Sequence, residues 1–298
     1  MSTSSDRPPT IAPAAAARWE AAAPAASPWL HEEVGRRMAD RLQWIKRDPQ
    51  AWADWEPVRG GLRAHGLVRK QYPQAGVYVV EPQADRMTMA RDQLARPWWR
   101  LGAPRTDFGP VSAGSVQMLW ANMQLHMAAD PQVLLRQWHE ALAVDGFLMF
   151  SCLGPDTLRE LRAAYAAMGW PPPAHEFTDM HDWGDMLVQG GFAEPVMDME
   201  RIRLSFDTPA RLLDELRELG ANLHPARFPA LRGRGWTNKL ETALDQHLRG
   251  PDGKLTLTFE VIYGHALKPL PRAKVGERSS VSLDDMRTML QADRSGRS

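Results

Sequence analysis

The chain has 298 residues, and its 36 lysines and arginines are balanced by 36 aspartates and glutamates. This zero formal charge argues against a general nucleic-acid binder, because such proteins need a basic surplus to displace counterions from phosphates. The single cysteine, Cys152, excludes an internal disulfide framework and any cysteine-rich zinc site. Hydrophobic residues make up 44% of the sequence, which is typical of a soluble globular protein with a sizeable core.

The two ends of the chain differ in composition from its middle. Residues 1–27 are rich in alanine, proline and serine and lack a sustained apolar face, so we expect a disordered tail there. Prolines and clustered charges indicate a flexible tail over 268–298, in which Ser282 opens a capping box for a short helix. The folded body is therefore expected over 28–267.

The sequence gives no sign of a membrane segment. No apolar run approaches the roughly 18 residues that a spanning helix needs. The N-terminus lacks the basic start and apolar core of a secretory signal, so we expect a cytoplasmic protein. No feature of the sequence indicates an oligomeric state.

Short apolar runs alternate with helical patterns along the first half of the body. Apolar spacing predicts helices over 30–45, 61–72, 86–94 and 131–142, and apolar runs predict strands over 51–55, 77–80, 116–121 and 147–150. The run 147–150 carries no polar side chain, as is typical of parallel strands covered on both faces. This order predicts an α/β fold with a doubly wound, mostly parallel sheet.

The pattern changes after Cys152. Helices are expected over 208–219 and 236–248, and strands over 196–204 and 255–266. The last of these runs alternates between apolar and polar residues, which suits an antiparallel strand at one side of the sheet. The second half therefore adds an antiparallel strand and inserted helices to the parallel core.

In such a sheet, a ligand binds at the C-terminal ends of the strands, where the strand order reverses. Glu81 ends the second predicted strand and can bind the two ribose hydroxyls of a nucleoside, or it is a surface residue before a turn proline. Asn122 ends the strand 116–121, where its amide faces a ligand or caps a loop. The turn after 51–55 is expected to carry a glycine-rich loop.

Several segments of the chain resemble a known family of enzymes. They are residues 36–42, 119–122, 146–150, 154–162, 177–182 and 195–200. Over about residues 32–267 the chain resembles class I S-adenosylmethionine-dependent methyltransferases, and among them the malonyl-[acyl-carrier-protein] O-methyltransferases of biotin synthesis. The same segments also resemble a sister group, the methyltransferase-like arginine hydroxylases that assemble respiratory complex I.

The resemblance implies a Rossmann-like methyltransferase fold with a seven-stranded sheet. It also implies S-adenosylmethionine as cofactor, an acyl carrier protein as partner, and methylation of a malonyl carboxylate. By the family's pattern, four residues are expected to contact the cofactor, namely Asp54, Gly60, Glu81 and Asn122. No catalytic residue is assigned, because an ionised carboxylate needs positioning and desolvation more than a strong base.

The chain departs from the family in the first motif, an acidic residue followed by Gly-x-Gly-x-Gly. Asp54 and Gly60 match it, whereas Glu56 and Val58 replace the first two glycines. Those glycines allow a tight turn and a close approach of the backbone to the ligand, so the Val58 side chain is expected where the ligand would lie. The sequence therefore leaves two hypotheses open, a methyltransferase and a non-catalytic binding or assembly protein on a retired methyltransferase fold.

Two further features have alternative interpretations. His175, Asp179 and His181 are spaced as metal ligands can be, but the same segment suits the start of a helix, which we favour. His126 follows Asn122 by one helical turn and has no acidic neighbour in the sequence, so we interpret it as structural. Residues 201–274 carry an excess of five basic residues, which suits an acidic carrier protein or a solvated face.

Overall fold

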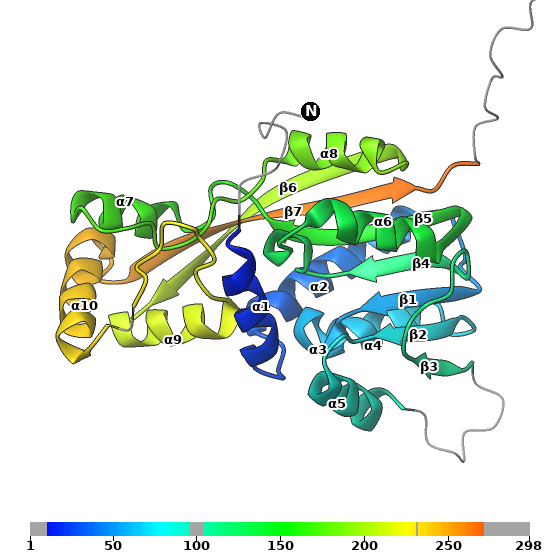
Figure 1. Ribbon diagram of the computed structural model, residues 1–298, viewed down its shortest axis with the longest axis horizontal. Coiled ribbons are helices and arrows are strands. Elements are labelled where there is room, and N and C mark those ends of the chain that lie inside the picture. The colour runs from blue at the N-terminus through cyan, green and yellow to red at the C-terminus, as the bar shows by residue number, and fades with distance from the viewer. Residues whose placement is uncertain (1–10, 96–103, 231, 271–298) are drawn as a thin grey trace, which may run out of the picture.

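The computed structural model describes residues 11–95, 104–230 and 232–270. Its sheet has seven strands in the order β3-β2-β1-β4-β5-β7-β6 (Figure 1). The strands are β1 (Ala51–Trp55), β2 (Gly76–Val80), β3 (Thr106–Phe108), β4 (Val116–Ala121), β5 (Leu142–Leu153), β6 (Ala193–Phe206) and β7 (Leu255–Leu267). The first five strands pair in parallel, while β7 lies antiparallel between β5 and β6. The predicted doubly wound, mostly parallel α/β sheet is confirmed.

The helices connect these strands and cover both faces of the sheet. They are α1 (Pro13–Ala22), α2 (Trp29–Arg41), α3 (Pro57–Gly60), α4 (Leu62–Gln71), α5 (Ala84–Leu94), α6 (Pro131–Ala141), α7 (Arg159–Ala167), α8 (Met180–Gln189), α9 (Pro209–Leu219) and α10 (Arg234–Leu248), with 3₁₀ turns η1 (Leu42–Trp44) and η2 (Leu125–Met127). Asp130 caps α6 as predicted, since its carboxylate accepts a hydrogen bond from Val133 N at 3.0 Å.

The alternation of side chains along β4 shows why the sheet is covered on both faces. Met118 and Trp120 belong to one apolar cluster, shared with Val34 of α2, whereas Leu119 belongs to a second cluster, shared with Trp138 of α6. All five side chains are buried. A strand that packs on both sides is mostly apolar, and β4 shows this pattern except at Gln117, whose side chain accepts a hydrogen bond from Ala51 N.

The two last strands are much longer than the parallel ones. β6 and β7 pair over their whole lengths and extend past the parallel core, where α7, α9 and α10 pack on them (left side of Figure 1). We call this part the β6–β7 extension. It places three helices beside the edge of the sheet where β1 and β4 end.

Residues 13–22 are helical, which corrects that part of the disordered tail predicted over 1–27, while residues 1–10 lie outside the described residues. Residues 13–22 form α1, which docks on the body through Ile11 and Ala15 against Leu223 and through a hydrogen bond from Ala12 N to Leu223 O at 2.9 Å. Alanine has high helix propensity, but its small side chains leave little apolar periodicity to detect. The short C-terminal helix predicted near Ser282 lies outside the described residues.

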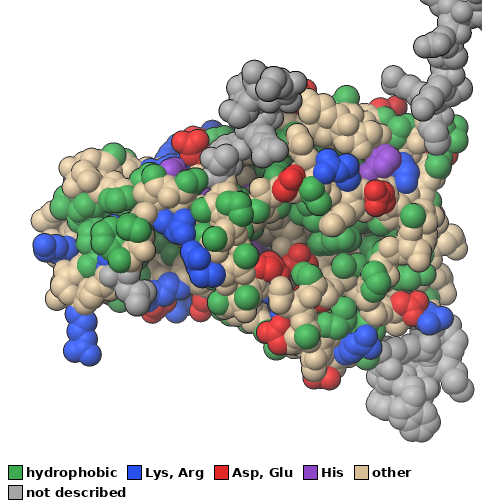
Figure 2. Space-filling view, in the orientation of Figure 1, with side chains coloured by type: hydrophobic (Ala, Val, Ile, Leu, Met, Phe, Trp, Pro, Cys, Tyr) green, Lys and Arg blue, Asp and Glu red, His purple; other side chains and the backbone are tan. Residues whose placement is uncertain are grey.

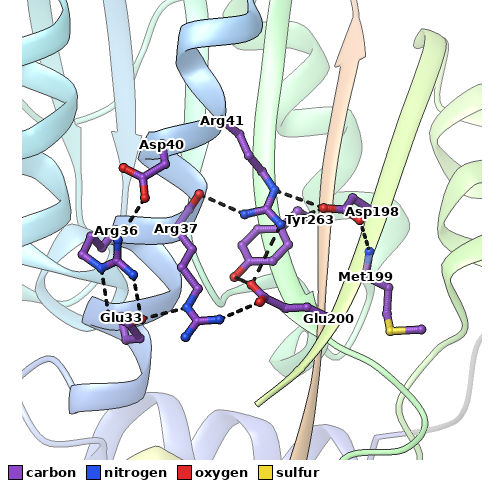
Figure 3. A network of polar contacts seen from close by, with 9 residues as sticks. All are labelled: Glu33, Arg36, Arg37, Asp40, Arg41, Asp198, Met199, Glu200 and Tyr263. Atoms are coloured by element: carbon purple, nitrogen blue, oxygen red, sulfur yellow. Dashed lines mark hydrogen bonds and ion pairs between the residues drawn. The ribbon is translucent and has the colours of Figure 1, made fainter.

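A network of charged side chains fastens α2 to the β6–β7 pair (Figure 3). Arg37 lies 2.6 Å from Glu200, and Arg41 lies 2.7 Å from Asp198. The Tyr263 hydroxyl of β7 donates to Glu200 at 2.6 Å, and Arg41 lies 3.7 Å above the Tyr263 ring. Two segments that carry the family resemblance, 36–42 and 195–200, therefore meet in space and hold helix and sheet together.

Candidate functional site

The strand order reverses between β1 and β4, which are parallel neighbours in the sheet although β2 and β3 separate them in sequence. This is the switch point where ligands bind in open α/β sheets. The structure brings the four predicted residues together there. The Glu81 carboxylate accepts from Val58 N at 2.8 Å, and Asn122 Nδ2 donates to His31 O at 2.7 Å and to Gly60 O.

Gly60 packs closely against the end of β4, since a Cβ there would lie 3.1 Å from the Asn122 carbonyl oxygen, a tight contact. Asp54 is buried at the end of β1 and accepts a hydrogen bond from His65 Nδ1 of α4 at 2.7 Å. Burial raises the pKa of Asp54, and His65 opposes this rise. Asp54 therefore ties α4 to β1 and does not face open space.

The loop after β1 adopts a different course from a glycine-rich turn. Glu56 has φ 54° and ψ 54°, in the left-handed region that favours glycine, and Pro57 then begins the single turn α3. The sequence led us to expect Val58 where a ligand would lie, but its side chain is fully buried in the core and only its N–H faces Glu81. The residue that projects toward the switch point is Glu56.

Three carboxylates surround one guanidinium at this edge. Arg86 of α5 is 2% exposed and lies 3.4 Å from Glu81 and 3.7 Å from Glu56, and it also pairs with Glu20 of α1. One positive charge cannot compensate three negative charges without water, so burial raises the pKa of Glu56 to about 8 and that of Glu81 to about 7. We call these four residues the Arg86 cluster.

Helix α1 lies across the strand ends, between α3 and α9 (Figure 1), and encloses a cavity of about 320 Å³ with them. We call it the α1 cavity. Arg59 closes one side, since its guanidinium donates to Ala26 O and Glu218 O, each at 2.9 Å, and lies 5.4 Å from the Trp19 ring. The N-terminal helix is thus fixed over the switch point by two buried arginines, Arg59 and Arg86.

A second cavity, of about 390 Å³, lies between the strand ends and the β6–β7 extension. We call it the apolar cavity, because apolar side chains form most of its wall, among them seven leucines, Phe177 and Phe259. Its polar side includes His126 and His175, both buried. The two cavities share Met127 and Leu219 as wall residues, so they are neighbours at the end of β4.

The side chains of residues 175–182 are not arranged as metal ligands. His175 is buried and donates to His126 O at 2.9 Å, whereas the His181 side chain is 84% exposed beside Asp179. Asp179 caps α8 by accepting from His181 N, and Asp182 lies in the first turn, which confirms that this segment starts a helix. Within the described residues no group of three His, Cys, Asp or Glu side chains is placed to hold a metal ion.

The switch point is covered in this arrangement, although Glu81 keeps a free acceptor. One oxygen of its carboxylate accepts from Val58 N, while the other lies 3.4 Å from Arg86 without a hydrogen-bond partner in the described structure, so it can still accept from a ribose hydroxyl of a nucleoside at this position. Arg86 in turn holds Glu20, so α1 stands over the position. The replaced glycines are visible in the sequence. The covering of the switch point by α1 is not, because it depends on a contact between Glu20 and Arg86, which are 66 residues apart.

None of the described helices combines the length and the apolar character that crossing a membrane requires.

Comparison with known proteins identifies the family. No family model matches the chain. The chain is 38% identical over 272 residues to the malonyl-[acyl-carrier protein] O-methyltransferase of Laribacter hongkongensis, covering 88% of each chain. It is also 38% identical over 259 residues to the enzyme of the same name from Gallionella capsiferriformans, covering 83% of this chain and 87% of the relative.

Solved structures agree on the fold. The YcgJ protein of Bacillus subtilis superposes with a TM-score of 0.53 at 11% identity, over 79% of this chain and 100% of that one. A proposed methyltransferase of Bacillus halodurans C-125 gives 0.52 at 14% identity, over 78% and 98%. The sheet is thus the Rossmann-like methyltransferase fold that the resemblance implied, and the chain belongs to the malonyl-[acyl-carrier protein] O-methyltransferase family.

Proposed function

We propose that the chain is an S-adenosylmethionine-dependent methyltransferase that esterifies the free carboxylate of a malonyl group on an acyl carrier protein, in the cytoplasm and for biotin synthesis. The names of its relatives support the reaction. One structural observation supports it independently: the α1 cavity and the apolar cavity meet at the end of β4 and share Met127 and Leu219. A transfer between two bound molecules needs two adjoining sites of this kind.

The cofactor would supply an activated methyl group at the switch point. The chain's own residues contribute positioning and the exclusion of water, because a malonyl carboxylate is already ionised at neutral pH. The proposal assigns Asp54, Gly60, Glu81 and Asn122 to the cofactor edge. Since that edge is closed while Glu20 pairs with Arg86, the proposal also requires α1 to move away before the cofactor enters.

The basic surface suits a carrier protein, which is acidic. Lysines and arginines gather over the end of the molecule formed by α9 and α10 (Figure 2). Among them, Arg232 lies 3.5 Å above the Trp236 ring and 4.1 Å from the Phe228 ring, and it lines the apolar cavity. Such a surface speeds the approach of an acidic partner and places it beside the cavity that its cargo would enter.

A second function is favoured by a specific observation, the Arg86 cluster. If α1 never leaves Arg86, the switch point stays filled, and the chain is a non-catalytic binding or assembly protein. The Glu56 side chain at the position of a family glycine supports this alternative, because it places a carboxyl group inside the cofactor edge.

Calorimetric titration of the full chain with S-adenosylmethionine and S-adenosylhomocysteine separates the two functions. Saturable micromolar binding, followed by methyl transfer to a malonyl carrier protein, supports the enzyme and contradicts the alternative. Absence of binding by the natural chain, with binding recovered in Glu56→Gly, supports the non-catalytic protein. Complementation of a biotin-requiring strain then tests the substrate.

A further inference from the structure

The polar end of the apolar cavity holds a histidine whose protonation pattern is fixed. His175 is 3% exposed, and its Nε2 lies 2.9 Å from the His126 carbonyl oxygen. A carbonyl oxygen only accepts hydrogen bonds, so Nε2 carries the proton. Burial lowers the pKa of His175, which keeps the ring neutral near pH 7. A neutral imidazole has one N–H, and His175 Nδ1 is therefore an acceptor.

That acceptor has no partner in the protein. Neither His175 Nδ1 nor His126 Nδ1 makes a hydrogen bond within the described structure, and both atoms are buried. The two rings flank Phe177, with centroids 4.7 Å and 5.9 Å from its ring. Buried polar atoms in folded proteins are nearly always paired, so two unpaired nitrogens at one end of a cavity call for a ligand or a water.

Two of the other polar residues of the wall are already engaged in hydrogen bonds or ion pairs. Asn222 donates to Pro172 O at 2.7 Å and accepts from His224 N at 2.9 Å. Arg217 pairs with Asp214 at 2.6 Å. The volume of about 390 Å³ lies within the range of about 300–1,000 Å³ that small-molecule sites occupy. Of the polar residues in this wall, His126 and His175 are the buried ones, so they can select a ligand by hydrogen bonding deep in the cavity.

As a hydrogen-bond acceptor, His175 Nδ1 excludes an ionised carboxylate as its partner and favours an amide N–H. An ionised carboxylate has no proton to donate, so a malonyl carboxylate does not satisfy Nδ1. The arm that carries acyl groups on carrier proteins, phosphopantetheine, has amide N–H groups joined by methylene and methyl groups. The N–H groups match the acceptor, and the hydrocarbon parts match the leucine-rich wall.

We infer that His175 Nδ1, with His126 beside it, accepts a hydrogen bond from an amide N–H of the pantetheine arm of a carrier-bound thioester. This rests on the carrier-bound substrate of the proposed function. It makes His175 a positioning residue, which fixes how far the arm enters the apolar cavity and hence where the acyl carboxylate stands relative to the α1 cavity.

Two conservative variants of the full chain separate this function from a structural one. In His175→Gln, the amide N–H₂ reaches the place of Nε2 and keeps the bond to His126 O, but no acceptor remains at Nδ1. In His175→Asn, the amide oxygen stands near Nδ1, while the bond to His126 O is lost. The exposed His181→Gln is the control.

The probes are malonyl-coenzyme A, which has the same arm, and the malonyl thioester of ethanethiol, which has no amide. We expect His175→Gln to weaken malonyl-coenzyme A binding about tenfold in calorimetry, as for one lost hydrogen bond, while His175→Asn stays within about threefold. Binding of the ethanethiol thioester should not change in either variant. In the natural chain, malonyl-coenzyme A should shift the ¹⁵N resonance of His175 Nδ1.

Three results would overturn the inference. The opposite order, with His175→Asn weakened and His175→Gln unaffected, assigns His175 a structural role alone. If both probes bind equally well in the natural chain and in the His175 variants, the arm lies elsewhere. If the ¹⁵N resonance of His175 Nδ1 does not shift in the bound state, the hydrogen bond to Nδ1 comes from water and not from the arm. If the natural chain binds neither probe, the result contradicts the proposed carrier-bound substrate. The inference about His175 is then contradicted as well, because it rests on that substrate.

Discussion

At the scale of single residues, Glu56 combines two unfavourable features. Its backbone is in the left-handed region, and its carboxyl is held beside two other carboxyls around Arg86. Left-handed angles disfavour residues with a Cβ, and a buried charge without full compensation is unfavourable. The importance of Glu56 can be predicted from the sequence, because it stands at a glycine position of a family motif. The direction of the Val58 side chain cannot, because it depends on the φ and ψ of Glu56.

Glu56→Gly should raise the free energy of unfolding by about 1 kcal/mol, because it removes the left-handed strain and one buried carboxyl, against the greater flexibility of glycine in the unfolded chain. Urea denaturation measures the change. Glu194→Gly is the matched control, since Glu194 has φ 51° but is exposed. An equal gain in both variants would show that the buried carboxyl of Glu56 contributes nothing.

Tyr263→Phe removes the hydroxyl that donates to Glu200, and should lower the free energy of unfolding by about 1–2 kcal/mol. Tyr72→Phe is its control, because the Tyr72 hydroxyl is buried without a hydrogen-bond partner in the described structure. That variant should be neutral or slightly stabilising. Thermal unfolding of both proteins tests the pair, and a loss in Tyr72→Phe as large as in Tyr263→Phe contradicts the assignment.

At the scale of elements, α1 buries few of its own side chains. It has ten residues and one buried side chain, Ala15. Helices this short are marginal in water without tertiary contacts. Its position therefore depends on Trp19, Glu20 and the backbone bond to Leu223, all of which are contacts distant in sequence. Such contacts leave no periodic pattern, which is why sequence reasoning predicted disorder here.

Glu20→Gln should loosen α1, because it removes the charge that pairs with Arg86. Backbone amides over 14–22 should exchange hydrogen faster than in the natural chain. If α1 gates the switch point, S-adenosylhomocysteine should bind more tightly in the same variant, since the competent state is more populated. Arg18→Gln, on the exposed side of α1, is the control. Faster exchange with unchanged affinity would show that α1 does not limit access.

At the scale of the whole molecule, the Arg86 cluster links stability to pH. Glu56 has a pKa raised to about 8 in the folded protein, so the folded state binds a proton more tightly than the unfolded state. Stability should therefore fall as pH rises from about 6.5 to 8, a window above the usual pKa of histidine. Glu56→Gln should make the free energy of unfolding less dependent on pH in this window. At pH values below about 7, Glu81 should still contribute to the pH dependence, because its pKa is raised to about 7. Urea midpoints measured across this window test it, and an unchanged slope contradicts the shift.

The overall architecture was accessible from sequence, because apolar runs such as 77–80 and 147–150 report directly on burial. β3 was missed, since three residues carry too little pattern. The two cavities and the pairing of His175 with His126 were not accessible. They arise from contacts between segments 49 or more residues apart, which a single sequence does not reveal.

The position of β7 has a consequence for how the protein is made. β7 is the last strand described, yet it lies between β5 and β6 and bonds to both. On the ribosome, β6 therefore emerges some 50 residues before β7, the strand that pairs with it. The edge of β5 that bonds to β7 stays unpaired for longer still. Unpaired edges invite association with other chains, and non-local pairing is slow. Synthesis paused before residue 255 should leave a nascent chain that depends on chaperones.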